Sequence, residues 1–189
     1  MWLCTLLFFA PSFSPADQSQ TIELSYDNGI CLSVNVTAPE IADVHTVRRL
    51  FSEAKSFKIE PPSTSKAGWL SLKTPSYSRP GDNAQYFGQC NFVEGVEGFL
   101  RQSDDNFGGC RPTSGKAYHS NPGTKDNIIV RCLELQETNC SISLIEAVDS
   151  IDIGVFFFFT DQPPSSWMAI SEDLRSFVAK NIFHNPDCR

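Results

Sequence analysis

The chain has 189 residues, of which 41% are hydrophobic and 20% charged, and its formal net charge is -7. This length suits one domain with a substantial hydrophobic core. The acidic balance argues against nucleic acid and anionic membrane surfaces as partners, and it is compatible with a basic partner.

The N-terminal segment has the pattern of a secretory signal. Residues 2–10 form an apolar core, and residues 14–16 place Ser, Pro and Ala at the cleavage position. The pattern departs from the usual one because no Lys or Arg precedes the apolar core. A membrane anchor is the alternative, but a bilayer span needs about 20 apolar residues. We expect residues 1–16 to be a signal peptide and residues 17–189 one globular domain, periplasmic or secreted.

The cysteine content agrees with export. One of the seven cysteines, Cys4, lies in the leader, and six remain: Cys31, Cys90, Cys110, Cys132, Cys140 and Cys188. An even number in an exported chain predicts three disulfides, and six cysteines allow 15 pairings among which the sequence does not choose. A zinc site would need Cys or His pairs two to four residues apart, which these six do not form. We expect no metal and no cofactor.

The first predicted element is a β-hairpin over residues 21–36, with Gly29 in its turn. A two-residue turn would place polar residues opposite apolar ones, whereas a three-residue turn puts the apolar residues on one face. The pairs are then Tyr26 with Ile30, Leu24 with Leu32 and Ile22 with Val34. This register predicts a type I turn, a left-handed Gly29 and a G1 bulge.

An amphipathic helix is predicted over residues 39–54. Its apolar stripe recurs at helical spacing: Ile41, Val44, Val47, Phe51 and Ala54. His45 has no acidic or cysteine partner at metal-ligand spacing, so we expect a structural or surface histidine. Beyond this helix, prolines interrupt residues 60–85, which hold one short strand candidate, Gly68–Leu72.

Residues 103–125 form a long segment rich in Gly, Pro and Ser. Loops of this length are uncommon in compact domains and are usually either functional or disordered. A disulfide at Cys110 would hold the middle of the loop. The residues expected to contact a partner combine hydrogen-bond donors with an aromatic anchor: Arg111, Ser114, Lys116, Tyr118 and His119.

The chain is organised around its most apolar run after the leader, IDIGVFFFFT at residues 151–160. Ten such residues suit a buried strand. A two-residue turn before it pairs residues 141–148 in a register that keeps the apolar residues together: Val148 with Ile151, Leu144 with Val155, and Ile142 with Phe157. With a third strand at 127–135, this gives a meander over 127–160. Phe156 and Phe158 point to the opposite face, so we expect both faces to be covered, at least near the middle of the sheet.

A second amphipathic helix is predicted over residues 166–183, with the stripe Trp167, Ile170, Leu174, Phe177, Val178 and Ile182. The predicted fold class is therefore α+β. A largely antiparallel sheet, made of the N-terminal hairpin and the meander 127–160, would be covered by helices 39–54 and 166–183.

No catalytic motif stands out, and the chain contains no Gly-x-Ser-x-Gly sequence. The layout instead resembles bacterial periplasmic immunity proteins, in its export leader, acidic charge, cysteine pairs, Gly/Ser/Asn-rich loop and closing strand, Trp and helix. This resemblance implies a rigid, non-enzymatic scaffold that inserts a loop into the active site of a secreted effector. The alternatives are a secreted hydrolase that uses His119 and nearby hydroxyls, and an exported domain with a structural role.

Overall fold

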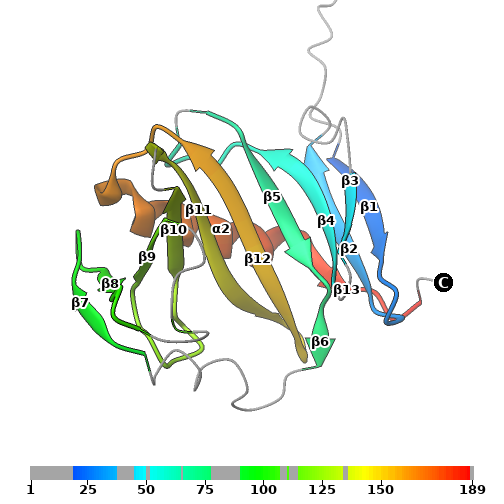
Figure 1. Ribbon diagram of the computed structural model, residues 1–189. Helices are drawn as coiled ribbons and strands as arrows, with labels where there is room; N and C mark the ends of the chain where they lie inside the picture. The colour runs from blue at the N-terminus through cyan, green and yellow to red at the C-terminus, as the bar shows by residue number, and fades with distance from the viewer. Residues whose placement is uncertain are drawn as a thin grey trace, which may run out of the picture.

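The computed structural model describes residues 19–37, 45–49, 52–64, 66–77, 90–106, 110, 115–133 and 136–187. These residues form two antiparallel sheets and one α-helix (Figure 1). The small sheet has the order β1-β2-β13, with β1 Ser19–Ser25, β2 Cys31–Thr37 and β13 Ile182–His184.

The large sheet contains ten strands in the order β3-β4-β5-β12-β11-β10-β9-β8-β7, with β6 paired to β12. In chain order these strands are β3 His45–Arg49, β4 Ser52–Ile59, β5 Gly68–Lys73, β6 Ser76–Tyr77, β7 Phe92–Glu94, β8 Leu100–Gln102, β9 Lys116–His119, β10 Ile129–Leu133, β11 Gln136–Val148 and β12 Ile151–Thr160. A short 3-10 helix, η3 Pro164–Ser166, leads into the α-helix, α2 Trp167–Asn181.

The predicted N-terminal hairpin is confirmed. β1 and β2 pair in the expected register, with Leu24 opposite Leu32. The Tyr26 amide donates to the Ile30 carbonyl at 3.0 Å, and the Gly29 amide donates to the Tyr26 carbonyl at 2.9 Å. Gly29 has a φ of 80°, the left-handed conformation that a G1 bulge requires.

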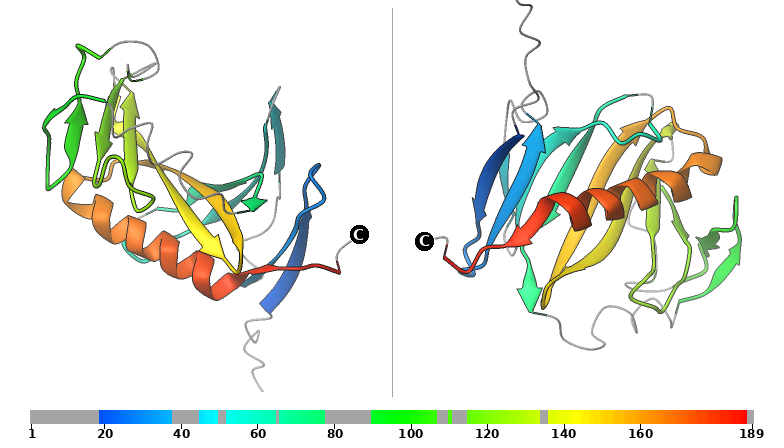
Figure 2. Two further views of the ribbon diagram at one scale, coloured as in Figure 1. Left: turned by 90° about the horizontal axis from the view of Figure 1, so that it is seen from below. Right: turned by 180° about the vertical axis from the view of Figure 1, so that it is seen from behind.

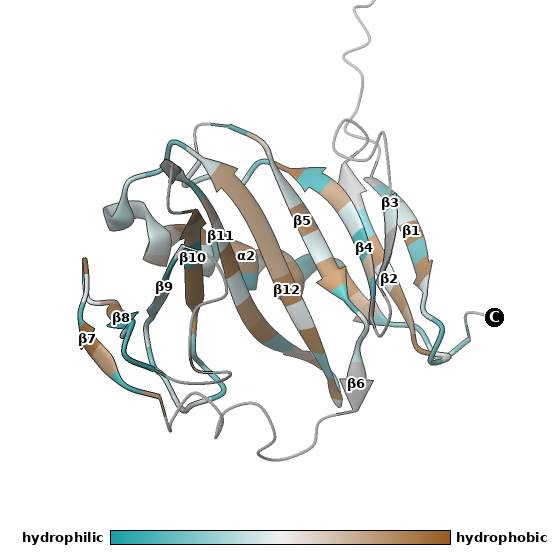
Figure 3. Ribbon diagram, in the orientation of Figure 1, coloured by the Kyte–Doolittle hydropathy of each residue, from teal (hydrophilic) through white to brown (hydrophobic). Residues whose placement is uncertain are grey.

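The predicted meander is also confirmed. β10, β11 and β12 are neighbours in the sheet, and β11 pairs with β12 in the register that places Val148 opposite Ile151 and Ile142 opposite Phe157. Figure 3 shows β12 as a mostly apolar strand in the middle of the sheet. The long strands fix the register because a shift by one residue would exchange the two faces of the sheet.

The helix predicted over 39–54 is wrong. Residues 45–49 and 52–59 form β3 and β4, which pair with each other, and β4 also pairs with β5. Along β4, Phe57 and Ile59 are buried while Lys58 between them is exposed, which is the period of a strand. Pairing with β5 outweighs the local helical spacing of the apolar residues. Residues 39–44, including Ile41 and Val44, lie outside the described residues.

The fold class is accordingly a mostly β structure rather than α+β. The second predicted helix is confirmed as α2, and its predicted stripe is buried at Trp167, Ile170, Leu174 and Val178. The last predicted helical residues instead form β13, where Ile182 pairs with Val34 of β2. Local periodicity does not reveal this change because Ile182 is buried in either conformation.

The helix α2 covers one face of the large sheet and reaches the small sheet (Figure 2, right). The core lies between them, and its largest fully buried apolar side chains include Phe157, Leu70, Leu72, Ile142, Ile170 and Leu174. Phe57 of β4 contacts Phe177 of α2 with ring centroids 6.2 Å apart. The small sheet is tied to the large one by the Tyr26 hydroxyl, which donates to the Leu72 carbonyl at 3.2 Å.

The face of the large sheet opposite α2 is more exposed than we expected from the sequence. Along β12 the odd-numbered residues are buried, but Phe158 is 54% exposed. The sheet curves around this side, away from α2 (Figure 2, left). Among the described elements, α2 is the one α-helix, and a single helix covers one face of a sheet.

Two disulfides join described cysteines, Cys90 with Cys110 and Cys132 with Cys140. Cys132 and Cys140 lie directly opposite each other on β10 and β11. Cys31 is also disulfide-bonded, and Cys188 lies outside the described residues. These disulfides are compatible with an exported, disulfide-stabilised protein.

We expect no reactive thiol in denatured, unreduced protein that lacks residues 1–16. The reason is that the six remaining cysteines form pairs in an oxidising compartment. Thiol titration in denaturant checks this, and two or more reactive thiols per chain would contradict the three-disulfide interpretation.

Candidate binding face

We define the open face as the surface of the large sheet opposite α2, which faces the viewer in Figure 1. The strand registers place one lateral row of side chains across its centre. The row consists of Lys58 on β4, Trp69 on β5, Phe158 on β12, Ser141 on β11 and Arg131 on β10. Each of these residues is directly opposite the next one, so five strands contribute to one continuous line.

Aromatic side chains occupy the middle of the open face. Phe156 and Phe158 lie on the same side of β12 and contact each other edge to face, with ring centroids 4.8 Å apart. Trp69 lies opposite Phe158, and both Trp69 and Phe156 are half-buried. Aromatic rings of this kind offer a large contact area to a ligand at a low cost in conformational entropy.

Cations surround these rings. The Lys58 ammonium lies 5.3 Å from the centroid of the Trp69 ring, and the Lys73 ammonium lies 5.7 Å from that of Phe156. Both lysines and Arg131 are exposed. Such cation–π contacts hold a charged group over an aromatic face while part of it stays available to solvent.

The serine side chains on this side of the sheet are largely buried, with Ser56 7% and Ser141 5% exposed. Ser56 and Ser71 share a hydrogen bond of 2.7 Å, and the buried Ser143 hydroxyl lacks a hydrogen-bond partner within the described part of the chain. Ser143 is directly opposite Phe156 in the β11–β12 register. The accessible part of the open face therefore combines aromatic and cationic groups, which suits binding through apolar contact and charge.

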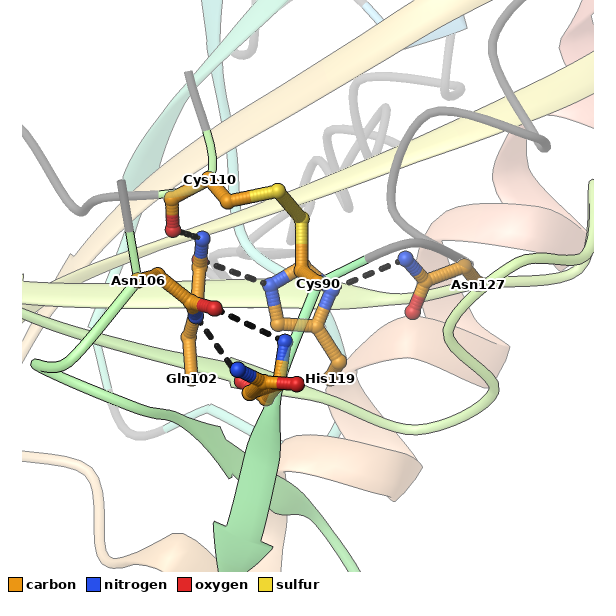
Figure 4. The surroundings of a disulfide bond; sticks show 7 residues. Cys90, Gln102, Asn106, Cys110, His119 and Asn127 are labelled. Atoms are coloured by element: carbon orange, nitrogen blue, oxygen red, sulfur yellow. Dashed lines mark hydrogen bonds between the residues drawn. A yellow bond between two sulfur atoms is a disulfide. The ribbon is translucent and has the colours of Figure 1, made fainter. Parts of the chain in front are cut away.

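A second cluster surrounds His119, which is fully buried (Figure 4). Its Nδ1 lies 2.9 Å from the Asn127 side-chain amide nitrogen, and its Nε2 lies 3.3 Å from Gln102 Oε1. The Gln102 amide nitrogen in turn donates to the Cys110 carbonyl. The Phe92 ring meets the imidazole edge to face, with centroids 5.0 Å apart.

These contacts specify a neutral imidazole. Asn127 donates to Nδ1, so the proton is on Nε2, which donates to Gln102. Burial, followed by the positive charge of Arg131, lowers the pKa of His119 to about 4, although the hydrogen bond with Asn127 acts in the opposite direction. Both ring nitrogens are engaged by amide side chains, which is the arrangement of a structural histidine rather than of a general base.

The buried histidine predicts acid sensitivity. His119 has a pKa of about 4 in the folded state and an ordinary value of 6.5 when unfolded. Above pH 6.5 neither state is protonated there; below it the unfolded state binds the proton first, so stability is lost as the pH falls toward 4. We expect a loss of about 3 kcal/mol in the free energy of unfolding from this group. In His119→Gln, the free energy of unfolding in urea should fall less between pH 6.5 and 4 than in the wild type. The same fall in both proteins would contradict the assignment of this pH dependence to His119.

Of the five residues predicted to contact a partner, the structure describes Lys116, Tyr118 and His119. Arg111 and Ser114 lie outside the described residues. Lys116 begins β9 and is half-buried, whereas Tyr118 and His119 are buried. Tyr118 packs against Trp167 on the α2 side, with ring centroids 5.2 Å apart. Strand β9 directs Tyr118 toward α2 and His119 to the opposite face of the sheet, and both side chains are buried.

Comparison of the chain with models of known families, with curated proteins and with solved structures gives no match. Within the described ranges, no helix is both long enough and apolar enough to cross a membrane. No group of three or more His, Cys, Asp or Glu side chains among the described residues could hold a metal ion. The function of the candidate site is therefore inferred from its own geometry.

The sequence contained a signal for the open face. Phe156 and Phe158 alternate with Val155 and Phe157, so their position on a second face was predictable. Their exposure was not predictable, because it depends on how many elements cover that face. The pairing of Trp69 with Phe158 joins segments far apart in the chain and had no local signal.

Proposed function

We propose that this protein is an exported, disulfide-stabilised, non-enzymatic binding protein that holds its partner on the open face. The observation that carries the proposal is Phe158, which is 54% exposed at the centre of a row that also contains Trp69 and two cations. Monomeric soluble proteins rarely expose large contiguous apolar patches without a role in binding.

The composition of the row supports this proposal. Trp, Tyr and Arg are the residues that most often dominate binding energies at protein interfaces, and the row contains Trp69 and Arg131. The row is built on long, paired strands, and β10 and β11 are also joined by the disulfide between Cys132 and Cys140. A rigid surface loses little conformational entropy when a partner docks.

We further propose that the partner is a secreted antibacterial effector, so that the protein acts as a periplasmic immunity protein. The sequence layout supports this finer proposal, as do the disulfides and the absence of an available imidazole at His119. The segment that contains Arg111, Ser114 and Lys116 stays a second candidate contact. The alternative of a hydrolase loses support because both ring nitrogens of His119 are engaged.

The test uses any secreted effector that is encoded beside the gene. We expect the purified protein to form a complex with that effector on size-exclusion chromatography, and its periplasmic production to protect cells from the effector. Phe158→Ser should abolish both effects. The matched control is Phe183→Ser, because Phe183 is 44% exposed but lies on β13 of the small sheet.

The outcomes separate the two levels of the proposal. If the wild-type protein neither binds the effector nor protects the cells, the immunity function is wrong. If Phe158→Ser binds as tightly as the wild type, the open face is not the binding site. Turnover of a substrate that His119→Ala abolishes would replace the proposal by the hydrolase alternative.

A further inference from the structure

We propose that the open face recognises an acidic protein segment with an apolar anchor. This inference rests on the proposed function and specifies the chemistry of the partner. The net charge of the whole chain, -7, is by contrast compatible with a basic partner.

The charge of the open face is opposite to that of the whole chain. On β4, β5, β10, β11 and β12, the described open-face side chains include three cations, Lys58, Lys73 and Arg131. The carboxylate among them is Asp152, which lies at the far end of β12, opposite Ser76 of β6. Acidic groups thus dominate the molecule as a whole but not this surface, and charge complementarity favours an anionic partner.

The spacing of the row indicates what such a partner must offer. Phe158 is two strands from Lys58 and two strands from Arg131, so the cations flank an aromatic centre symmetrically. Four strand spacings of about 4.8 Å separate the two cations by about 19 Å. An extended peptide covers this distance with about six residues. Two carboxylates that far apart, with an apolar side chain between them, match the row.

Other anionic ligands match it less well. Nucleic acids and anionic membranes present continuous negative charge, which the remaining acidic surface of the chain repels. A neutral glycan would stack on the aromatic rings but would gain little from three cations. A protein segment supplies discrete carboxylates and an apolar anchor in the same short stretch, and Lys58 and Lys73 are already positioned over the rings.

Selection of random dodecapeptides on the immobilised full chain tests this inference. We expect the enriched peptides to carry net negative charge, with Leu, Ile or an aromatic residue between two acidic residues. Their dissociation constants, measured by fluorescence anisotropy, should rise at least about tenfold for Lys58→Glu/Arg131→Glu. The control Lys125→Glu/Lys180→Glu introduces the same change in net charge at exposed positions outside the row, and should change affinity less than about twofold. Thermal unfolding checks that both variants are folded.

Each alternative outcome has a distinct meaning. Enriched peptides that are neutral or basic, or acidic peptides that bind both double variants equally, would overturn the inference. Binding of heparin that depends on Lys58 and Arg131, without binding of acidic peptides, would also overturn it and leave the open face as a site for anionic glycans. Peptides that bind Phe158→Ser as tightly as the wild type would overturn the proposed function itself.

Discussion

Trp167→Ala should lower the free energy of unfolding by about 3–5 kcal/mol, because it removes the largest side chain at the start of α2 from the core. Trp167 is 2% exposed and contacts Phe99 and Tyr118, with ring centroids 5.5 and 5.2 Å away. It thereby fastens α2 to the β8–β9 end of the large sheet. Chemical denaturation monitored by circular dichroism measures the change.

Trp167→Phe is the matched control. The Trp167 Nε1 atom is buried without a hydrogen-bond partner in the described part of the chain, so phenylalanine loses no such bond and retains most of the apolar contact. We expect it to cost less than about 1.5 kcal/mol. Unchanged stability of Trp167→Ala, combined with loss of effector binding, would contradict this role and make the α2 stripe a partner surface.

Gly115→Ala should destabilise the protein by roughly 2–5 kcal/mol through two separate effects. Gly115 has a φ of 68°, a conformation that disfavours any residue with a Cβ atom. An added Cβ would also lie 1.8 Å from the Cys132 carbonyl oxygen and 3.0 Å from Leu133 Cα. These contacts are backbone atoms of β10, so relief requires separation of β9 from β10.

Gly29→Ala separates the two effects. Gly29 has a φ of 80°, but an added Cβ there meets no atom within 4 Å. This variant reports the conformational cost alone, which we expect to be about 1–2 kcal/mol. Thermal and urea unfolding of the two variants provide the comparison. Equal destabilisation would contradict a collision at Gly115.

The elements that the sequence predicted correctly are those whose partners lie close in the chain. The hairpin β1–β2 and the pair β11–β12 each have a short turn, and only one register keeps residues such as Leu24 and Phe157 on the buried face. Helix α2 was predictable because its stripe extends over several turns, from Trp167 to Val178.

The segment 39–54 could not be assigned from its own residues. Val47, Phe51 and Ala54 satisfy a helical period, yet β4 pairs with β5, which begins only at Gly68. The two strands are close in the chain. However, the prolines and polar residues that lie between them did not indicate a connection between two paired strands. Contacts outside the segment decided the conformation of its described residues, which form strands rather than a second helix.

The burial of Tyr118 and His119 also had no local signal in the sequence. Strand β9 has four residues, too few for a recognisable alternation, and it lies within a segment rich in Gly and Pro. In the register of β9 and β10, Tyr118 lies beside Val130 on the α2 face and His119 lies beside Ile129 on the opposite face. The disulfide pairs were equally hidden, since the facing positions of Cys132 and Cys140 depend on the register of β10 and β11.

The central claim is that the large sheet has one buried face and one open face available to a partner. Unfolding of Phe157→Ala and Phe158→Ala tests it most directly, because these neighbours on β12 are fully buried and 54% exposed, respectively. We predict a loss of about 3–5 kcal/mol for Phe157→Ala and of less than about 1 kcal/mol for Phe158→Ala. A loss for Phe158→Ala as large as that for Phe157→Ala would show that the open face is covered, and would contradict the account.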